Sequence, residues 1–343
     1  MKNVLIISLN SGGTMGHGRI ITSLANNLIE LKKNVTIVSE TDYSLFFTLN
    51  KNVKKISIPQ TRHVNYTIGG MYDYKQKNKI IDIFEKKKAD CVIFSTFFDP
   101  NLIKEIKKRK IKVILLSYPL RDTFRKALIL NKAYDLFDKV ISLYDPSVNR
   151  RQLKNEIIAN PLKVIKSGLR EKYLFDILIT CGGGGRPSSI IFMNKVFKAL
   201  EPILKKNKNL RVISISGNSR NKNKMKDVKF IKWSKRFEDL MASSKIIISE
   251  VGYFTMLDLV NNNKSAIFIP GLRIIDNQGL RALTLEDLGV GKVHFSFEKE
   301  QKLTELIEEF LGKYVNNVIK FVKIKKKFSK YKDLMSVVLD ELK

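Results

Sequence analysis

The chain of 343 residues combines 44% hydrophobic with 28% charged residues, a composition that excludes a wholly disordered or fibrous protein. It contains no run of the ~18 uninterrupted apolar residues that a membrane-spanning helix requires. Lys and Arg exceed Asp and Glu by a formal charge of +30, and such a field raises the local concentration of polyanions or anionic lipid without specifying a fold.

The length predicts two domains, since a domain averages roughly 150 residues. In the first half, short apolar runs alternate with amphipathic stretches, which predicts parallel strands joined by helices. Ile20, Leu24 and Leu28 share one helical face and complete a βαβ unit. Residues 59–78 are predicted to form a long loop, because they contain a glycine pair and many polar residues. The expected strands are residues 4–8, 35–39, 91–95, 113–117 and 140–143.

The same alternation restarts after residue 160 and predicts a second Rossmann-like domain. We therefore expect one domain over residues 1–160 and a second over 161–318, facing one another across a cleft. The expected strands of the second are residues 175–180, 212–216, 246–249 and 266–269, with another near Phe230.

Residues 319–343 are predicted to form a basic C-terminal helix. Phe321, Ile324 and Phe328 fall at helical spacing and form an apolar stripe with lysines on both sides. Such a stripe either packs back on the first domain or lies at an anionic membrane surface. The sequence leaves both alternatives open.

The cysteines and histidines predict neither a disulfide nor a metal site. Cys91 and Cys181 are far apart and each adjoins an expected strand, which fits small buried thiols in a reducing cytoplasm. His17, His63 and His294 have no His or Cys partner at ligand spacing. No Asp-x-Asp pair occurs either, so we expect metal-independent chemistry.

Two glycine-rich turns each follow an expected strand and precede an expected helix. The first contains Gly12, Gly13, Thr14, Gly16 and His17, and the second contains Gly183 and Gly184. Glycine lets the backbone approach a diphosphate, and a helix N-terminus offers free N–H groups. Tight turns also need glycine for conformational reasons alone. Neither loop has the spacing of a dinucleotide-binding or Walker motif.

The first loop is close to the Gly-Gly-Thr-Gly-Gly-His motif of MurG-like transferases, with Met15 and Ile20 as departures. Further segments follow the order of that family's donor-side motifs: Trp233 to Ala242, Ser249 to Asp258 and Ile269 to Gly289. The chain thus resembles the MurG-like family 28 glycosyltransferases over most of its C-terminal half. In the N-terminal half the resemblance is confined mainly to the first loop.

The resemblance implies a GT-B fold, in which residues 1–160 would bind the acceptor and residues 161–318 would bind the nucleotide sugar. It also implies an inverting transfer from a UDP-sugar, which is a substrate, with no cofactor. In the family an acid holds the ribose, and Asp258 stands at that position. Trp233, Ser234 and Phe237 would form the wall around the uracil. Gln278 would contact the sugar, and Arg281 replaces a family asparagine. The implied donor-binding residues are Lys163, Gly183, Gly184, Ser188, Trp233, Ser234, Phe237, Gly252, Phe254, Thr255, Asp258, Gln278 and Arg281.

Several of these positions depart from the family pattern. Gly184 replaces a serine near the diphosphate, although Ser188 follows it. Lys163 replaces an arginine that would neutralise phosphate charge. The acceptor side is implied to use Gly12, Gly13, Thr14 and Gly16.

The candidate catalytic base is His17, with Asp99 at the end of an expected strand as the second candidate. Three of the candidate residues also have a purely structural interpretation. His17 could be a helix-capping residue, Trp233 a core aromatic and Asp258 a solvated helix residue. The sequence does not decide which of His17 and Asp99 is the base.

Together these features predict a UDP-sugar-dependent hexosyltransferase, most closely a UDP-N-acetylglucosamine transferase, acting on a lipid-linked acceptor in cell-envelope biosynthesis. The predicted location is the cytoplasmic face of the membrane, bound through its anionic surface. A UDP-sugar hydrolase or epimerase of the same fold is the alternative. Nucleic acid is not an expected partner, because the chain has no recognised nucleic-acid-binding motif.

Overall fold

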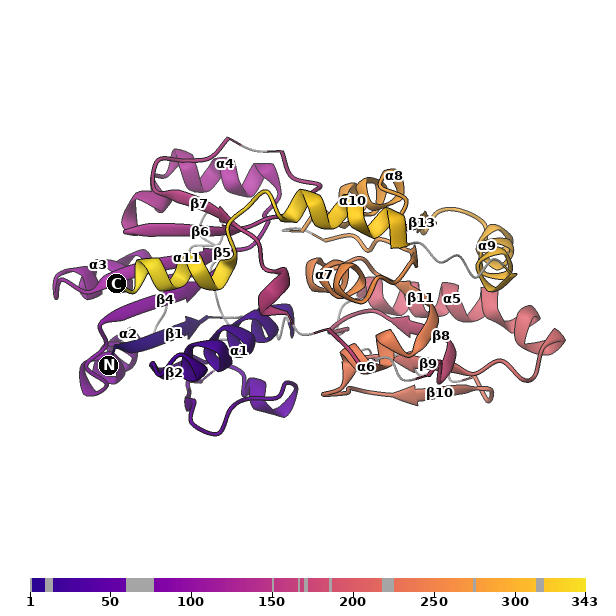
Figure 1. Ribbon diagram of the computed structural model, residues 1–343, viewed down its shortest axis with the longest axis horizontal. Coiled ribbons are helices and arrows are strands. Elements are labelled where there is room, and N and C mark those ends of the chain that lie inside the picture. Colours follow the sequence, from indigo (N-terminus) through magenta and orange to yellow (C-terminus); the bar gives the residue numbers. More distant parts are fainter. Residues whose placement is uncertain are drawn as a thin grey trace. The chain divides into compact units, whose positions relative to one another are not determined.

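Two separate parallel sheets organise the chain (Figure 1). The computed structural model describes residues 2–9, 15–59, 77–149, 151–165, 167–169, 172–184, 187–217, 225–273, 276–312 and 318–343. One compact unit comprises Met1–Val164 with Tyr331–Lys343, and the second comprises Ile165–Lys330.

The first unit is built on a seven-stranded sheet with the order β3-β2-β1-β4-β5-β6-β7. All its pairings are parallel, and its central strands are apolar runs buried on both faces. The strands are β1 (Asn3–Ser8), β2 (Asn34–Ser39), β3 (Lys54–Ser57), β4 (Cys91–Ser95), β5 (Lys112–Ser117), β6 (Lys139–Leu143) and β7 (Glu156–Ala159). The five predicted strands are confirmed to within one residue, whereas β3 and β7 were not predicted.

Helices connect these strands. The α-helices of the first unit before the chain leaves it are α1 (Met15–Glu30), α2 (Lys77–Lys86), α3 (Pro100–Lys107) and α4 (Asp122–Leu130). Short 3-10 turns are η1 (Tyr43–Leu45), η3 (Ala133–Leu136) and η4 (Leu162–Val164). Because η4 packs against α1, the first unit extends to Val164, slightly beyond the predicted boundary. The predicted loop over residues 59–78 lies almost wholly outside the described residues.

The second unit repeats the design with a six-stranded sheet in the order β10-β9-β8-β11-β12-β13. Its strands are β8 (Phe175–Thr180), β9 (Val212–Ile215), β10 (Val228–Ile231), β11 (Ser244–Ser249), β12 (Ala266–Phe268) and β13 (Gly291–Val293). Its helices are α5 (Pro187–Lys206), α6 (Phe237–Ala242), α7 (Tyr253–Asn262), α8 (Gln278–Asp287), α9 (Glu300–Gly312) and α10 (Val318–Phe328). These two parallel sheets confirm the predicted doubly wound fold.

The C-terminal segment is two helices, so the prediction of one helix over residues 319–343 is wrong. After α10 the backbone of residues 332–334 pairs with Asn160, which accepts from Leu334 N at 2.9 Å and donates to Lys332 O at 2.8 Å. Asp333 then caps α11 (Leu334–Glu341), accepting hydrogen bonds from Met335 N and Ser336 N. The last helix packs against β6 and β7 and so returns to the first unit, one of the two alternatives that the sequence leaves open.

The apolar stripe of α10 is buried within the second unit. Phe321, Ile324 and Phe328 are at most 1% exposed, and α10 packs against α7. The stripe therefore stabilises the protein and is closed to lipid. Within the described part of the chain, no helix is both long and apolar enough to span a bilayer.

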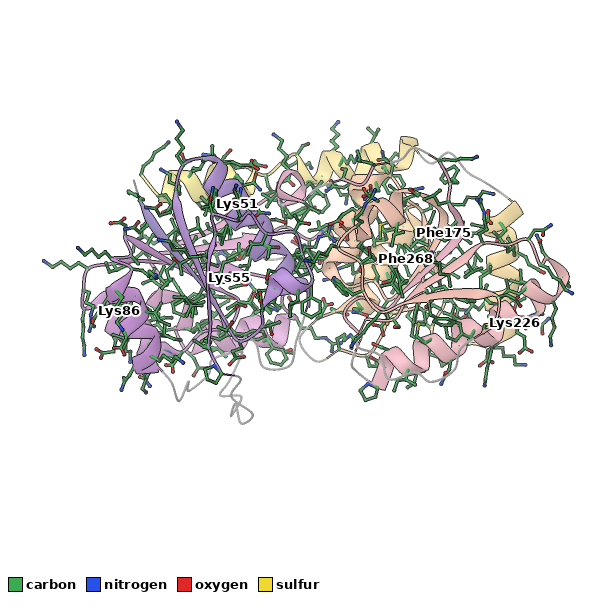
Figure 2. All side chains as sticks on the ribbon, turned by 90° about the horizontal axis from the view of Figure 1, so that it is seen from below. Lys51, Lys55, Lys86, Phe175, Lys226 and Phe268 are labelled. Carbon is green, nitrogen blue, oxygen red and sulfur yellow. The ribbon has the colours of Figure 1, made fainter. Side chains whose placement is uncertain are left out.

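Lysines supply much of the exposed surface. Lys86 of the first unit and Lys226 of the second are exposed, whereas Phe268 lies among the strands of the second unit (Figure 2). The positive charge is therefore carried largely by solvated side chains, outside the cores that form the sheets.

We expect Phe328→Ala to destabilise the protein by about 3–5 kcal/mol, because a fully buried aromatic ring leaves a cavity when truncated. Val322 on the same helix is 60% exposed, and Val322→Ala should change stability by no more than about 0.5 kcal/mol. Urea unfolding midpoints measure both. Equal effects for the two variants would contradict the packing described for α10.

Candidate functional site

The carboxyl ends of β8 and β11 form the centre of the candidate site in the second unit. These strands are neighbours, with Thr180 opposite Ser249, and Glu250 N donates to Thr180 O at 3.3 Å. From β8 the sheet continues through β9 on one side and through β11 on the other. Such a reversal of strand order is where open parallel sheets bind ligands.

The second glycine loop leaves β8 at this point. Gly182 and Gly184 have φ values of 63° and 61°, a left-handed conformation that favours glycine. Gly182 N donates to Thr180 Oγ1 at 3.2 Å, and Gly184 N donates to Cys181 O at 3.3 Å. These glycines are therefore needed for the conformation of the turn. Because they lack side chains, they also leave a backbone loop that a phosphate can approach.

Helix α5 begins shortly after this loop. Ser188, in its first turn, is half-buried, and its hydroxyl has no hydrogen-bond partner among the residues that the structure describes. Ser188 is thus a polar group at a helix N-terminus with remaining hydrogen-bonding capacity, as a donor-binding serine requires.

The N-terminus of α7 follows β11 across the same edge. Gly252 is its N-cap residue and provides no side-chain cap. Phe254, Thr255 and Asp258 lie on α7 and are buried, with Asp258 1% exposed. The backbone N–H groups of the first turn are the part of this helix that can bind an anion. The interpretation of Asp258 as a solvated residue is wrong, because its side chain is closed to solvent.

Helix α8 contributes Gln278 and Arg281, both buried. Gln278 Oε1 accepts a hydrogen bond from Gly271 N at 2.9 Å, so its carbonyl side holds the loop after β12. Arg281 binds Asp276 at 2.7 Å and Val251 O at 3.1 Å, and its guanidinium lies 5.5 Å from the Tyr253 ring centre. These contacts give Arg281 a structural role in fixing the start of α7.

The residues predicted to form the wall around the uracil follow β10. Trp233, Ser234 and Phe237 are all half-buried, and Ser234 Oγ accepts from Arg236 N at 3.1 Å. Lys163, predicted on the donor side, is exposed in η4 and belongs to the first unit.

In the first unit, His17 lies on the first turn of α1, which follows β1. Its ring contacts those of Tyr118 and Phe97, with centroids 4.2 and 5.2 Å away. Burial lowers the pKa of His17 to about 3. Among the described residues no group hydrogen-bonds its buried Nδ1. His17 is thus a neutral imidazole at neutral pH.

Asp99, the second candidate base, caps α3. Its carboxylate is fully buried and accepts from Asn101 N at 2.7 Å and Leu102 N at 3.1 Å. The structure thereby gives Asp99 a helix-capping role. Gly16 accepts a hydrogen bond from the Tyr118 hydroxyl at 3.0 Å. Gly12, Gly13 and Thr14 lie outside the described residues.

Sequence reasoning missed two residues at the donor-side edge, Glu250 and Arg273. Arg273 Nη2 forms a buried ion pair with Glu250 Oε2. Glu250 lies inside the motif that carries the family resemblance, immediately after β11. A carboxylate at the end of a central strand was the observation that could have indicated it.

The cysteines are buried free thiols. Burial raises the pKa values of Cys91 and Cys181 to about 12, so both are protonated and poorly reactive. Within the described ranges, no three His, Cys, Asp or Glu side chains come close enough together to hold a metal ion.

Comparison with known proteins identifies the second half of the chain. Residues 177–335 match the glycosyltransferase family 28 C-terminal domain. This segment contains the second glycine loop, α7 and α8. The chain is a glycosyltransferase.

Solved structures share its whole architecture. The spinosyn forosaminyltransferase SpnP has a TM-score of 0.69 at 14% identity, over 99% of both chains. MurG from Acinetobacter baumannii has 0.60 at 14% identity, over 99% of both chains. The glycosyltransferase VinC in complex with dTDP has 0.67 at 10% identity, over 99% of this chain and 98% of VinC. This likeness confirms the GT-B fold of the glycosyltransferase, and it fits MurG and other GT-B enzymes equally. No curated protein matches by sequence.

We expect His17 to make the stability of the glycosyltransferase depend on pH. The folded-state pKa is about 3, below the unfolded value near 6.5, so the unfolded chain binds the extra proton first. The associated stability is present above about pH 6.5 and is lost toward pH 3, by about 1.4 kcal/mol per pH unit.

His17→Phe tests this, because it keeps an aromatic ring against Tyr118 and Phe97 but cannot titrate. The difference in unfolding free energy between variant and wild type should move in favour of the variant as the pH falls from 6.5 to 4. Urea unfolding at a series of pH values measures it. A difference that stays constant with pH would show that His17 is not buried as a neutral imidazole.

Proposed function

We propose that this glycosyltransferase is an inverting, metal-independent enzyme that transfers N-acetylhexosamine from a UDP-sugar to a lipid-linked acceptor in cell-envelope glycan biosynthesis. UDP-N-acetylglucosamine is the proposed donor. The proposed location is the cytoplasmic face of the cell membrane.

One observation carries the donor part of the proposal: the glycine loop after β8 and the N-terminus of α7 meet at one edge of the sheet. The Thr180 to Ser249 pairing holds them there. Free backbone N–H groups and the positive ends of the α5 and α7 dipoles favour a diphosphate at this place. Asp258 would hold the ribose, and Trp233, Ser234 and Phe237 would bind the base.

The proposed reaction is a direct displacement. The acceptor hydroxyl oxygen bonds to the anomeric carbon while the bond from that carbon to the diphosphate oxygen breaks. The hydroxyl proton passes to an unprotonated nitrogen of His17, and the nucleoside diphosphate leaves with the electron pair. Preorganised backbone donors would stabilise the leaving group, which supports catalysis without a metal ion.

The charge supports a membrane-associated acceptor. Lys323 and Lys326 are exposed on α10, whose apolar stripe is buried. Electrostatic attraction to an anionic membrane therefore does not need insertion of this helix, and each lysine near such a surface contributes about 1 kcal/mol. The surface charge favours a lipid-linked acceptor over a soluble one, and MurG is among the solved structures of similar fold.

We expect calorimetry to detect UDP binding, and Asp258→Ala to weaken it about 10- to 150-fold through loss of charge-assisted hydrogen bonds. Affinity for inorganic pyrophosphate should change little, because that probe has no ribose. Asp258→Asn controls for the buried carboxylate's packing. Absence of binding at millimolar UDP, with binding of dTDP instead, would contradict the proposed nucleotide.

His17→Ala should lower turnover about 100- to 10,000-fold with little change in donor affinity, as expected for a positioned base. Turnover is measured as UDP release from UDP-N-acetylglucosamine with and without membrane extract, in the presence of EDTA. A transferase requires the extract, whereas release at full rate without it would indicate a hydrolase. A wild-type rate in His17→Ala would assign the proton transfer to another group.

A further inference from the structure

Arg273 and Glu250 form a buried ion pair beside the carboxyl ends of β8 and β11. Glu250 is 2% exposed and Arg273 13% exposed as side chains. A Cβ at Gly271 would lie 2.7 Å from Glu250 Oε1, so only glycine leaves room for the carboxylate there. Gln278 Oε1 accepts a hydrogen bond from the backbone N–H of the same glycine. The pair is therefore built into the loop between β12 and α8.

The guanidinium of Arg273 has hydrogen-bonding capacity left over. Its Nη2 binds Glu250, but its Nη1 is buried and has no hydrogen-bond partner among the described residues. Arg281, eight positions later, differs because Asp276 and Val251 O bind both its terminal nitrogens. A buried guanidinium N–H without an acceptor is costly, and an anionic ligand would remove that cost.

The pair lies close to the glycine loop. Glu250 N binds the last residue of β8, one position before Cys181. The Cys181 thiol is affected by both charges: after burial, the largest cause, Glu250 raises its pKa and Arg273 lowers it. The unused donor of Arg273 is thus on the same edge as the loop and the start of α7.

Electrostatics explains why the two residues occur together. A buried carboxylate beside a diphosphate would repel it unless a cation lay between them. A guanidinium can bind a carboxylate with one nitrogen and a phosphate with another, because its donors form a planar fork. Glu250 would then fix the orientation of Arg273 before the ligand arrives.

The geometry points to Arg273 as a diphosphate-binding residue of this glycosyltransferase, held in position by Glu250. The inference rests on the proposed donor site but concerns its phosphate chemistry alone, so it can be tested with or without a nucleoside. The ligand group is a diphosphate, carried by a nucleotide sugar, by its nucleoside diphosphate product or by free pyrophosphate.

The test compares two double variants of the full chain. Glu250→Gln with Arg273→Met removes the pair, leaves neither partner as an unpaired buried charge and keeps the net charge constant. Asp176→Asn with Arg211→Met does the same to an arginine–carboxylate pair at the amino end of the same sheet, where Asp176 and Arg211 lie 3.3 Å apart. Calorimetry with UDP, UMP, dTDP and inorganic pyrophosphate gives the affinities, and thermal unfolding verifies that each variant is folded.

The site variant should lose about 10- to 100-fold in affinity for UDP and pyrophosphate. Its affinity for UMP should fall by less than about threefold, since UMP lacks the second phosphate. The Asp176–Arg211 variant should match wild type for all probes. Arg273→Lys keeps the charge without the fork and should lose about 3- to 10-fold for the diphosphates only, which preserves the test if the double variant does not fold.

Equal affinity of wild type and site variant for the diphosphates would overturn the inference, as would an equal loss for UMP and UDP. If the wild-type protein binds pyrophosphate through Arg273 but binds neither UDP nor dTDP, the inference is supported and the proposed nucleotide-sugar donor is overturned. Wild type that binds no diphosphate would overturn both.

Discussion

The reversal of strand order beside β8 is the constraint on which the donor side depends. Because β9 lies on one side of β8 and β11 on the other, the connections after β8 and β11 diverge and leave the edge between them uncovered. Two backbone turns are thereby held together by the pairing of Thr180 with Ser249. The same reversal at β1 and β4 brings His17 and the Phe97 to Asp99 turn to one edge of the first sheet.

The sequence predicts those parts of the fold in which burial requires a recognisable pattern of apolar residues. The central strands are apolar on both faces and read as continuous runs. Strand β3 contains Lys54 and Lys55 at an exposed edge, and β13 has only three residues, so pairing with a neighbour, and not composition, makes them strands. The break before α11 depends on a backbone bridge to Asn160, a contact that no local pattern reports.

The candidate site divides in the same way. The turn after β8 could be predicted because a left-handed backbone favours glycine, and the sequence shows glycine at both left-handed positions, Gly182 and Gly184. The different roles of Arg281 and Arg273 could not be predicted from the sequence. Arg281 and Arg273 look alike in sequence. Only tertiary contacts show that both terminal nitrogens of Arg281 are bound, whereas Arg273 has a buried nitrogen with no partner in the described part of the chain. Helix capping by Asp99 was not predicted, although this aspartate is followed by a proline, which is a sequence signature of a helix N-terminus.

The excess of surface lysines does not substitute for such a buried cation. An exposed charge acts through water and is screened beyond about 8 Å at physiological salt, so it raises the encounter rate with anions of every kind. A guanidinium fixed by a buried carboxylate acts at one place, with defined geometry and weaker screening. The chain's positive field can therefore gather anionic substrates and surfaces, while selection of a diphosphate requires the oriented donors at the β8–β11 edge.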